Sequence, residues 1–79
     1  MGVEMKVMTI VSDLSKIPME ELELNSDIFE SNIITSLGLL ELVSRLEKEF
    51  DLVILPEELI HENFGTIEMI INLIGRKAL

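Results

Sequence analysis

The clearest pattern in the sequence is an apolar stripe at helical spacing over residues 36–50. Five apolar side chains fall within one arc of about 100°, which is the width of an ordinary core-facing stripe. They are Leu39, Leu42, Val43, Leu46 and Phe50. The stretch from Asp51 to Pro56 ends the pattern, since proline disfavours a helical conformation in the residue before it. We therefore predict a helix over residues 36–50, with Thr35 or Ser36 able to cap its first turn.

Two other segments show the same period. Residues 3–14 carry an apolar stripe with charged residues off that face, so a first helix is predicted there. Its members are Val3, Val7, Ile10, Val11 and Leu14. Gly65-Thr66 opens a last helix, whose predicted buried stripe consists of Ile67, Ile70, Ile71 and Ile74. Gly75, Arg76 and Lys77 suit the electronegative C-terminal end of that helix.

The remaining segments connect these helices. A long connection follows the first helix, and such loops are uncommon unless they carry function or pack by their own side chains. Leu22, Leu24, Ile28 and Phe29 can supply that packing. A short helical turn is predicted over residues 56–61, with Pro56 at its first position. We therefore expect one domain over residues 1–79 and an all-α fold, a small four-helix bundle with a long first loop and a short third helix.

Charge and composition narrow the possible functions. Fifteen acidic residues against six basic residues give a formal net charge of −9, which disfavours binding to nucleic acids and anionic membranes. The absence of cysteine excludes disulfide bonds and thiolate metal sites. The N-terminal residues lack the pattern of a signal peptide, and no apolar run is long enough to span a bilayer. From these features we expect a monomeric protein in the cytoplasm.

Ser36 is the best candidate for chemistry, because it begins an apolar helix in a chain with one histidine and no cysteine, tryptophan or tyrosine. Its hydroxyl can serve as a place to attach another group, or it can simply cap the helix. Leu37 follows directly and points away from the core stripe. Four polar or charged residues share its side of the helix: Glu41, Ser44, Arg45 and Lys48. An exposed leucine on a polar face beside Ser36 is what a docking surface requires, although one exposed leucine can also be incidental.

Other arrangements are weaker candidates. Glu57 and His61 lie one helical turn apart, as do Glu58 and Glu62, a spacing that could in principle hold a metal. Solvated charges on a short acidic helix explain the same spacing, and we expect no metal site. His61 has no serine near it in sequence and no obvious acid to orient it, which argues against a hydrolase. Because a glycine-rich phosphate loop is also missing, no catalytic residue and no enzyme activity are predicted.

Five segments carry a further signal when they are taken in order. They are Asp27-Ile28-Phe29-Glu30, Thr35-Ser36-Leu37, the helix from Glu41 to Phe50, Pro56-Glu57-Glu58-Leu59 and Asn63-Phe64-Gly65-Thr66-Ile67. Together they resemble the acyl and peptidyl carrier proteins over roughly residues 22–74. That family bears a phosphopantetheine arm on a serine, and its fold is also a four-helix bundle with a long first loop and a short third helix.

The resemblance implies a free-standing carrier that holds an acyl or aminoacyl group as a thioester on a 4'-phosphopantetheine arm. A phosphopantetheinyl transferase would take this arm from coenzyme A and attach it to Ser36. Further implied partners are an acyl- or aminoacyl-loading ligase and a downstream synthase or transferase, as in fatty acid, polyketide or nonribosomal peptide synthesis. The implied partner-binding residues are Thr35, Leu37, Glu41, Ser44, Arg45 and Lys48.

Two positions depart from the family pattern. Thr35 stands where the family has aspartate directly before the modified serine, and Asn32 stands where it usually has glycine. Thr35 can still cap a helix, but it cannot supply the negative charge that resembles a recognition element for transferases. The alternative to a modified carrier is therefore a carrier-like binding module that stays unmodified.

Overall fold

Four α-helices and two short 3-10 turns make up the computed structural model, which describes residues 2–78. Their order is α1 (Val3–Ser15), η1 (Met19–Glu21), α2 (Ser36–Phe50), η2 (Pro56–Glu58), α3 (His61–Phe64) and α4 (Ile67–Lys77). The expected all-α bundle with a long first loop and a short third helix is thereby confirmed. The helix predicted over residues 36–50 has those bounds, and α1 extends one residue beyond its predicted end.

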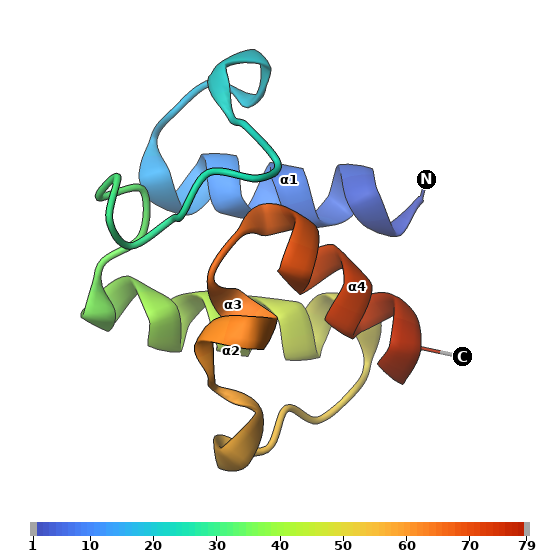
Figure 1. The fold of residues 1–79 in the computed structure, drawn as a ribbon. Coiled ribbons are helices and arrows are strands. Elements are labelled where there is room, and N and C mark those ends of the chain that lie inside the picture. Colours follow the sequence, from blue (N-terminus) through green and yellow to red (C-terminus); the bar gives the residue numbers. More distant parts are fainter. Residues whose placement is uncertain (1, 79) are drawn as a thin grey trace.

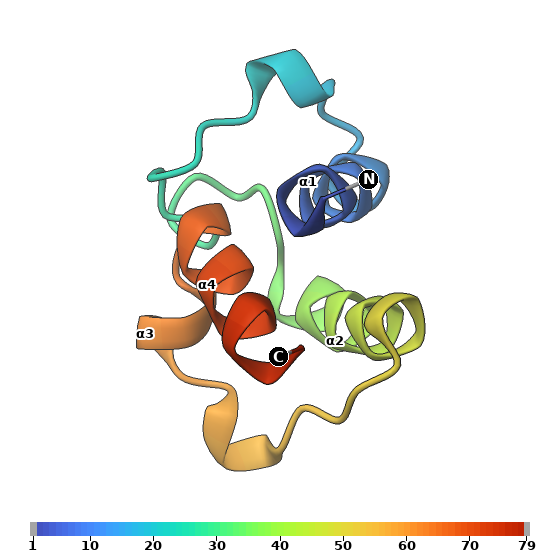
Figure 2. The same cartoon turned by 90° about the vertical axis from the view of Figure 1, so that its right-hand side faces the viewer.

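The helices pack around α1 and α4. α1 contacts both α2 and α4, and α3 packs on α4. Figure 1 shows α1 and α2 running in opposite directions, with the long loop at the top of the view and the α2–α3 connection at the bottom. In Figure 2, α3 lies on the side of α4 that faces away from the α1–α2 pair. The two irregular segments therefore lie on opposite sides of the bundle.

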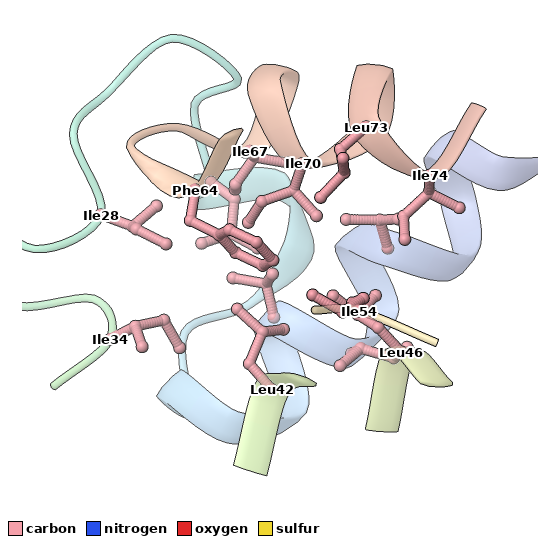
Figure 3. Packing of buried hydrophobic residues seen from close by; sticks show 14 residues of the cluster. Ile28, Ile34, Leu42, Leu46, Ile54, Phe64, Ile67, Ile70, Leu73 and Ile74 are labelled. Carbon is pink, nitrogen blue, oxygen red and sulfur yellow. The ribbon is translucent and has the colours of Figure 1, made fainter. Parts of the chain in front are cut away.

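The core consists almost entirely of aliphatic side chains drawn from all four helices and both connections. One cluster of buried residues contains Val7, Ile10, Val11, Leu22, Ile28, Ile34, Leu42, Leu46, Ile54, Phe64, Ile67, Ile70, Leu73 and Ile74. Phe64 is the aromatic member, and its ring points into the cluster (Figure 3). Within residues 2–78 no polar or charged residue is classed as buried, so the hydrophobic effect dominates the stability of this core.

The predicted stripes supply most of this core. The α1 and α2 stripes bury Val7, Val11, Leu42 and Leu46 fully and Ile10 almost fully. Their other members lie at stripe edges and are partly buried: Val3, Leu14, Leu39, Val43 and Phe50. In α4, Ile67, Ile70 and Ile74 are buried as predicted and Ile71 is partly buried, but the prediction missed Leu73, which is buried. Ile71 lines an open groove between α4 and Val3 of α1, which explains its exposure.

The short helical turn predicted over residues 56–61 is split in two. Pro56 begins the 3-10 turn η2 as expected, but α3 starts only at His61. The intervening Ile60 has an extended backbone, and the helix that restarts after it brings Phe64 into the core. At the other end of the chain, α4 continues through Gly75 to Lys77, so Gly75 is a helical residue and does not end the helix.

The long loop packs onto the corner between α3 and α4. Leu22 and Ile28 are buried, as the sequence indicated, and Ile34 is buried as well. The backbone N–H of Ile28 donates to the carbonyl of Gly65 at 2.9 Å, and the N–H of Glu68 donates to the carbonyl of Leu24 at 2.9 Å. These backbone bonds hold the second half of the loop, which leads directly into α2.

Candidate functional site

Thr35 and Ser36 take different roles at the start of α2. Thr35 is the N-cap, because its backbone is extended and its Oγ1 accepts a hydrogen bond from the Gly38 backbone N at 3.1 Å. A Cβ atom at position 38 would lie 3.3 Å from that oxygen, so glycine gives the cap room. Ser36 is the first helical residue and is exposed, and within residues 2–78 its hydroxyl has no protein hydrogen-bond partner. The cap therefore belongs to Thr35, and the Ser36 hydroxyl remains accessible.

A compact turn brings the chain to Ser36. The Asp27 Oδ1 accepts hydrogen bonds from the backbone N of Phe29 and of Glu30, each at 2.9 Å. Asn32 has a φ of 60°, in the left-handed region that glycine adopts most easily and asparagine more easily than most other residues. Asn32 therefore adopts a backbone conformation that glycine would also adopt without strain.

The outward side of α2 is exposed around Leu37. The Leu37 side chain is 82% exposed, and Glu41, Ser44 and Lys48 are exposed beside it. Sequence reasoning had placed these residues on this side of the helix but had missed Leu40, which is 64% exposed. The signal for Leu40 was its position outside the core stripe of α2. Two apolar side chains, and not one, therefore project from the first turns of the helix.

Arg45 lies at the border between this face and α1. Its Nη2 donates to Asp13 Oδ2 at 3.2 Å, and the residue is half-buried. An open groove of about 530 Å³ runs between the two helices and is lined by Leu14, Glu41, Ser44, Arg45, Lys48 and Glu49. The structure thus brings Ser44, Arg45 and Lys48 into one depression, while Leu37 does not line it. The two acids and two bases of the groove cancel in formal charge.

Further exposed apolar side chains lie on the connection between α2 and α3, where the sequence had suggested no surface role. Val53 is 65% exposed, Leu55 47% and Ile60 46%. Ile54, between the first two, is buried, and its backbone N donates to Glu47 Oε2 of α2 at 2.9 Å. The alternation of buried and exposed side chains reflects an extended backbone, in which successive side chains point to opposite sides.

His61 contacts an acid from a distant part of the sequence. Its Nε2 lies 3.0 Å from Asp27 Oδ2, so the expectation that no acid orients His61 was wrong. The Asp27 carboxylate raises the pKa of His61 above its ordinary value of 6.5, because it stabilises the imidazolium. The pKa of Asp27 is lowered, first by the backbone N–H of Glu30 and then by the bond to His61. This contact arises because the long loop folds onto the start of α3.

Glu58 is also engaged within the protein. Its two carboxylate oxygens accept hydrogen bonds from Lys77 Nζ at 2.8 and 3.0 Å, and this contact lowers the pKa of Glu58. Across the described part of the chain, no group of three or more histidine, aspartate or glutamate side chains could hold a metal ion. None of the helices within residues 2–78 is long and apolar enough to cross a membrane.

Comparison with known proteins places this site in a family. A search of the curated proteins gave no match. The family model described as "Phosphopantetheine attachment site" matches residues 6–74, which is most of the 79-residue chain and includes Ser36 and the turn before it. The match agrees with the four-helix architecture and with an exposed serine at the start of α2. The chain therefore belongs to the phosphopantetheine attachment-site family, and it is a carrier domain rather than an enzyme.

Proposed function

We propose that this protein is a free-standing acyl or aminoacyl carrier whose 4'-phosphopantetheine arm is attached to Ser36. The observation that carries the proposal is the family match over a segment in which Ser36 is exposed and its hydroxyl is not used as a cap. The arm, when attached, supplies a terminal thiol that holds the cargo as a thioester. The cargo and the pathway are set by the enzymes that load and receive it.

The start of α2 suits a phosphodiester. The first amides of a helix have no partner within the helix, and its positive end favours negative charge. Thr35 engages the amide of Gly38, so the amides of Ser36 and Leu37 remain to face a group on the Ser36 oxygen. Attachment would form a bond between the Ser36 Oγ and the phosphorus of the pantetheine phosphate. The serine proton is lost, and adenosine 3',5'-bisphosphate leaves from coenzyme A.

The partner face of the carrier would extend along α2 from Ser36. Leu37 offers an apolar contact, and Thr35, Glu41, Ser44, Arg45 and Lys48 offer polar and charged ones. α2 carries three acidic and two basic residues, so a partner selected by a run of acids should bind less well. The expected partners are a phosphopantetheinyl transferase, a loading ligase, and a downstream synthase or transferase. Binding should be transient, because a carrier must leave each enzyme in turn.

An unmodified carrier-like module is the second candidate function, and Thr35 is the observation that favours it. The carboxylate expected directly before the serine is missing, so a transferase that depends on this charge would modify the protein slowly or not at all. The fold does not separate the two candidates, since Thr35 caps α2 adequately in either case.

Intact mass after incubation with coenzyme A and a broad-specificity transferase distinguishes the candidates. The proposal expects the mass of one phosphopantetheine group to be added to the wild-type protein and to Ser31→Ala, but not to Ser36→Ala. Because Ser36 does not cap the helix, Ser36→Ala should remain folded, at a cost below the roughly 0.5–2 kcal/mol of a lost cap. Modification of Ser36→Ala would place the attachment elsewhere, and an unmodified wild-type protein would support the binding module.

A further inference from the structure

The turn that leads to Ser36 is joined to α3 by one carboxylate. Asp27 Oδ1 accepts from the backbone N–H groups of Phe29 and Glu30, and Oδ2 lies 3.0 Å from His61 Nε2. The same side chain therefore shapes the turn and reaches the first residue of α3. Ile28 and Ile34, which bracket the rest of the turn, are buried and joined by a backbone hydrogen bond of 2.9 Å. A shift of Asp27 would consequently be transmitted toward Ser36.

The His61 ring lies close to the backbone of Gly65, the residue that ends α3. A Cβ atom at Gly65 would lie 2.7 Å from His61 Nε2, so only glycine lets the imidazole lie this close to the backbone. The carbonyl of Gly65 accepts the backbone N–H of Ile28 at 2.9 Å, and Asp27 forms an isolated antiparallel bridge with Thr66. The ring, the turn and the α3–α4 corner thus meet at one point. The His61 side chain is 63% exposed, so protons from solvent reach it freely.

The charges around His61 all favour its protonated form. Asp27 and Glu30 act on it from the long loop, and Glu62 acts on it from α3. Partial burial of the ring acts in the opposite direction but does not outweigh the Asp27 contact. When the ring is protonated, the imidazolium donates to the Asp27 carboxylate and the two opposite charges attract. When the proton leaves, the neutral imidazole can still donate from Nε2 to the carboxylate, but the attraction between two charges is lost.

We propose that Asp27 and His61 form a proton-controlled latch between α3 and the turn that leads to Ser36. In this latch His61 is a positioning residue for the addition of phosphopantetheine to Ser36, and this addition is the loading step meant below. With His61 protonated, α3 holds the turn in one conformation and the Ser36 segment is preorganised for a transferase. At alkaline pH the latch loosens, and α3 and the turn move more independently. The effect on loading rests on the proposed attachment at Ser36, whereas the latch itself does not.

The latch is tested first by nuclear magnetic resonance on the unmodified protein. The Asp27→Asn variant is the matched change, because its side-chain oxygen can still accept the Phe29 and Glu30 amides while its charge is lost. We expect the pKa of His61 to fall toward 6.5 in this variant. In the wild type, exchange of the Ile28 and Gly65 amides, corrected for intrinsic rates, should accelerate as pH rises through the His61 titration. Equal His61 titration in both proteins, or pH-independent corrected exchange, would overturn the latch.

The role in loading is tested with two variants of opposite character. His61→Gln is never charged, and His61→Lys stays charged across the same range. Rates of phosphopantetheine addition are measured at about pH 5.5 and about pH 8.5. The rate for each variant is divided by the wild-type rate at the same pH, so that the pH response of the transferase itself cancels. At the lower pH the wild type should be modified about two- to fivefold faster than His61→Gln, a factor that corresponds to the free energy of an exposed ion pair. At the higher pH the two rates should be equal.

The His61→Lys variant shows whether the slower modification of His61→Gln comes from the lost charge or only from the lost imidazole ring. It should keep the faster rate at both pH values, since its charge persists. A constant ratio of wild type to His61→Gln across pH, or no rescue by lysine, would refute the positioning role. If no variant and no wild-type protein is loaded at any pH, the proposed attachment and the loading role fail together, and the resonance titration alone decides whether the latch exists.

Discussion

At the level of single residues, the start of α2 separates two tasks between adjacent side chains. The Thr35 hydroxyl caps the helix by accepting a hydrogen bond from the Gly38 backbone N–H, whereas Ser36 is exposed and does not cap the helix. A cap of this kind contributes about 0.5–2 kcal/mol to stability. A change at Ser36 should therefore leave the cap intact, whereas a change at Thr35 can alter both the cap and the proposed recognition by a transferase.

Replacing Thr35 by aspartate should speed modification without harming the fold. A carboxylate can accept the same bond from Gly38, and its charge is favourable at a helix N-terminus by about 0.3–1 kcal/mol. We expect Thr35→Asp to gain phosphopantetheine faster than the wild type and to melt at an equal or higher temperature. Thr35→Asn, which caps well without a charge, is the control. Equal modification rates for all three proteins would show that Thr35 is no handicap with that transferase.

Asn32 should show a preference for glycine over alanine. Its φ of 60° lies in the left-handed region, which costs an ordinary residue with a Cβ atom roughly 1–2 kcal/mol. Asn32→Ala is therefore expected to lower the free energy of unfolding by about 1 kcal/mol. Asn32→Gly should change it little, since glycine adopts this conformation freely. Urea unfolding of the three proteins makes the comparison, and an equally stable alanine variant would mean that the turn can adopt another conformation.

At the level of elements, α2 is an amphipathic helix whose two sides have separate tasks. Its inner side contributes Leu42 and Leu46, both fully buried, to the common core. Its outer side presents Leu37 and Leu40 to solvent. The connection that follows adds Val53, Leu55 and Ile60 to the exposed apolar residues of the chain. We propose that partner contacts are made on this outer side, since exposed apolar side chains on a polar face suit docking.

Two leucine substitutions on α2 should separate docking from folding. Leu37→Ala is expected to change the free energy of unfolding by no more than about 0.5 kcal/mol, as exposed substitutions usually do. Leu46→Ala should cost about 2–5 kcal/mol, because it leaves a cavity in the core. The two substitutions should rank differently in single-turnover loading by a partner enzyme. There, Leu37→Ala should be strongly impaired although its thermal melt is normal. A Leu37→Ala variant that melts and loads normally would remove this leucine from the partner surface.

At the level of the whole molecule, the net charge and the local ion pairs both determine how stability depends on pH. A formal charge of −9 on 79 residues produces repulsion among the acids, and this repulsion grows as the pH rises above their pKa values. The pKa of Asp27 is lowered first by the backbone N–H of Glu30 and then by His61. The pKa of Glu58 is lowered first by Lys77 and then by the backbone N–H of Leu55. His61 has a raised pKa. These groups set opposite limits to the pH range of greatest stability.

Stability should be greatest at mildly acidic pH. The lowered pKa of Glu58 contributes stability that is present above its ordinary value of 4.5 and is lost as pH falls through the lowered value. Asp27 acts in the same way about its ordinary value of 3.8. The raised pKa of His61 contributes stability that is fully present below 6.5 and is lost as pH rises through the raised value. We therefore expect the melting temperature to peak between about pH 4.5 and about pH 6.5.

Two controls distinguish the sources of this pH dependence. His61→Gln should flatten part of the alkaline side of the curve while leaving the acidic side unchanged. Added salt should raise the melting temperature at alkaline pH if repulsion among the acids is screened. A melting temperature that rises steadily from pH 5 to pH 9 would contradict both the stabilisation by protonated His61 and the repulsion among the acidic residues.

The helices and the candidate serine follow from local sequence. The 3.6-residue period of apolar residues predicts α1, α2 and most of the α4 stripe, because burial of one helix face is a property of the segment itself. The exposure of Leu37 follows from the same period, and the two hydroxyl residues where that period begins, Thr35 and Ser36, are read directly from the sequence. The ordered segments around Ser36 also suffice to identify the family that the chain belongs to.

Only the tertiary structure decided which hydroxyl caps α2, where α3 begins and which acid faces His61. Thr35 and Ser36 can both cap a helix by residue type, and the folded backbone shows that Thr35 is the one that meets the Gly38 amide. α3 begins at His61 because Phe64 must reach the core. Asp27 and His61 are 34 positions apart, and no local period relates them. Their contact exists because the long loop packs on the α3–α4 corner, which depends on the whole chain at once.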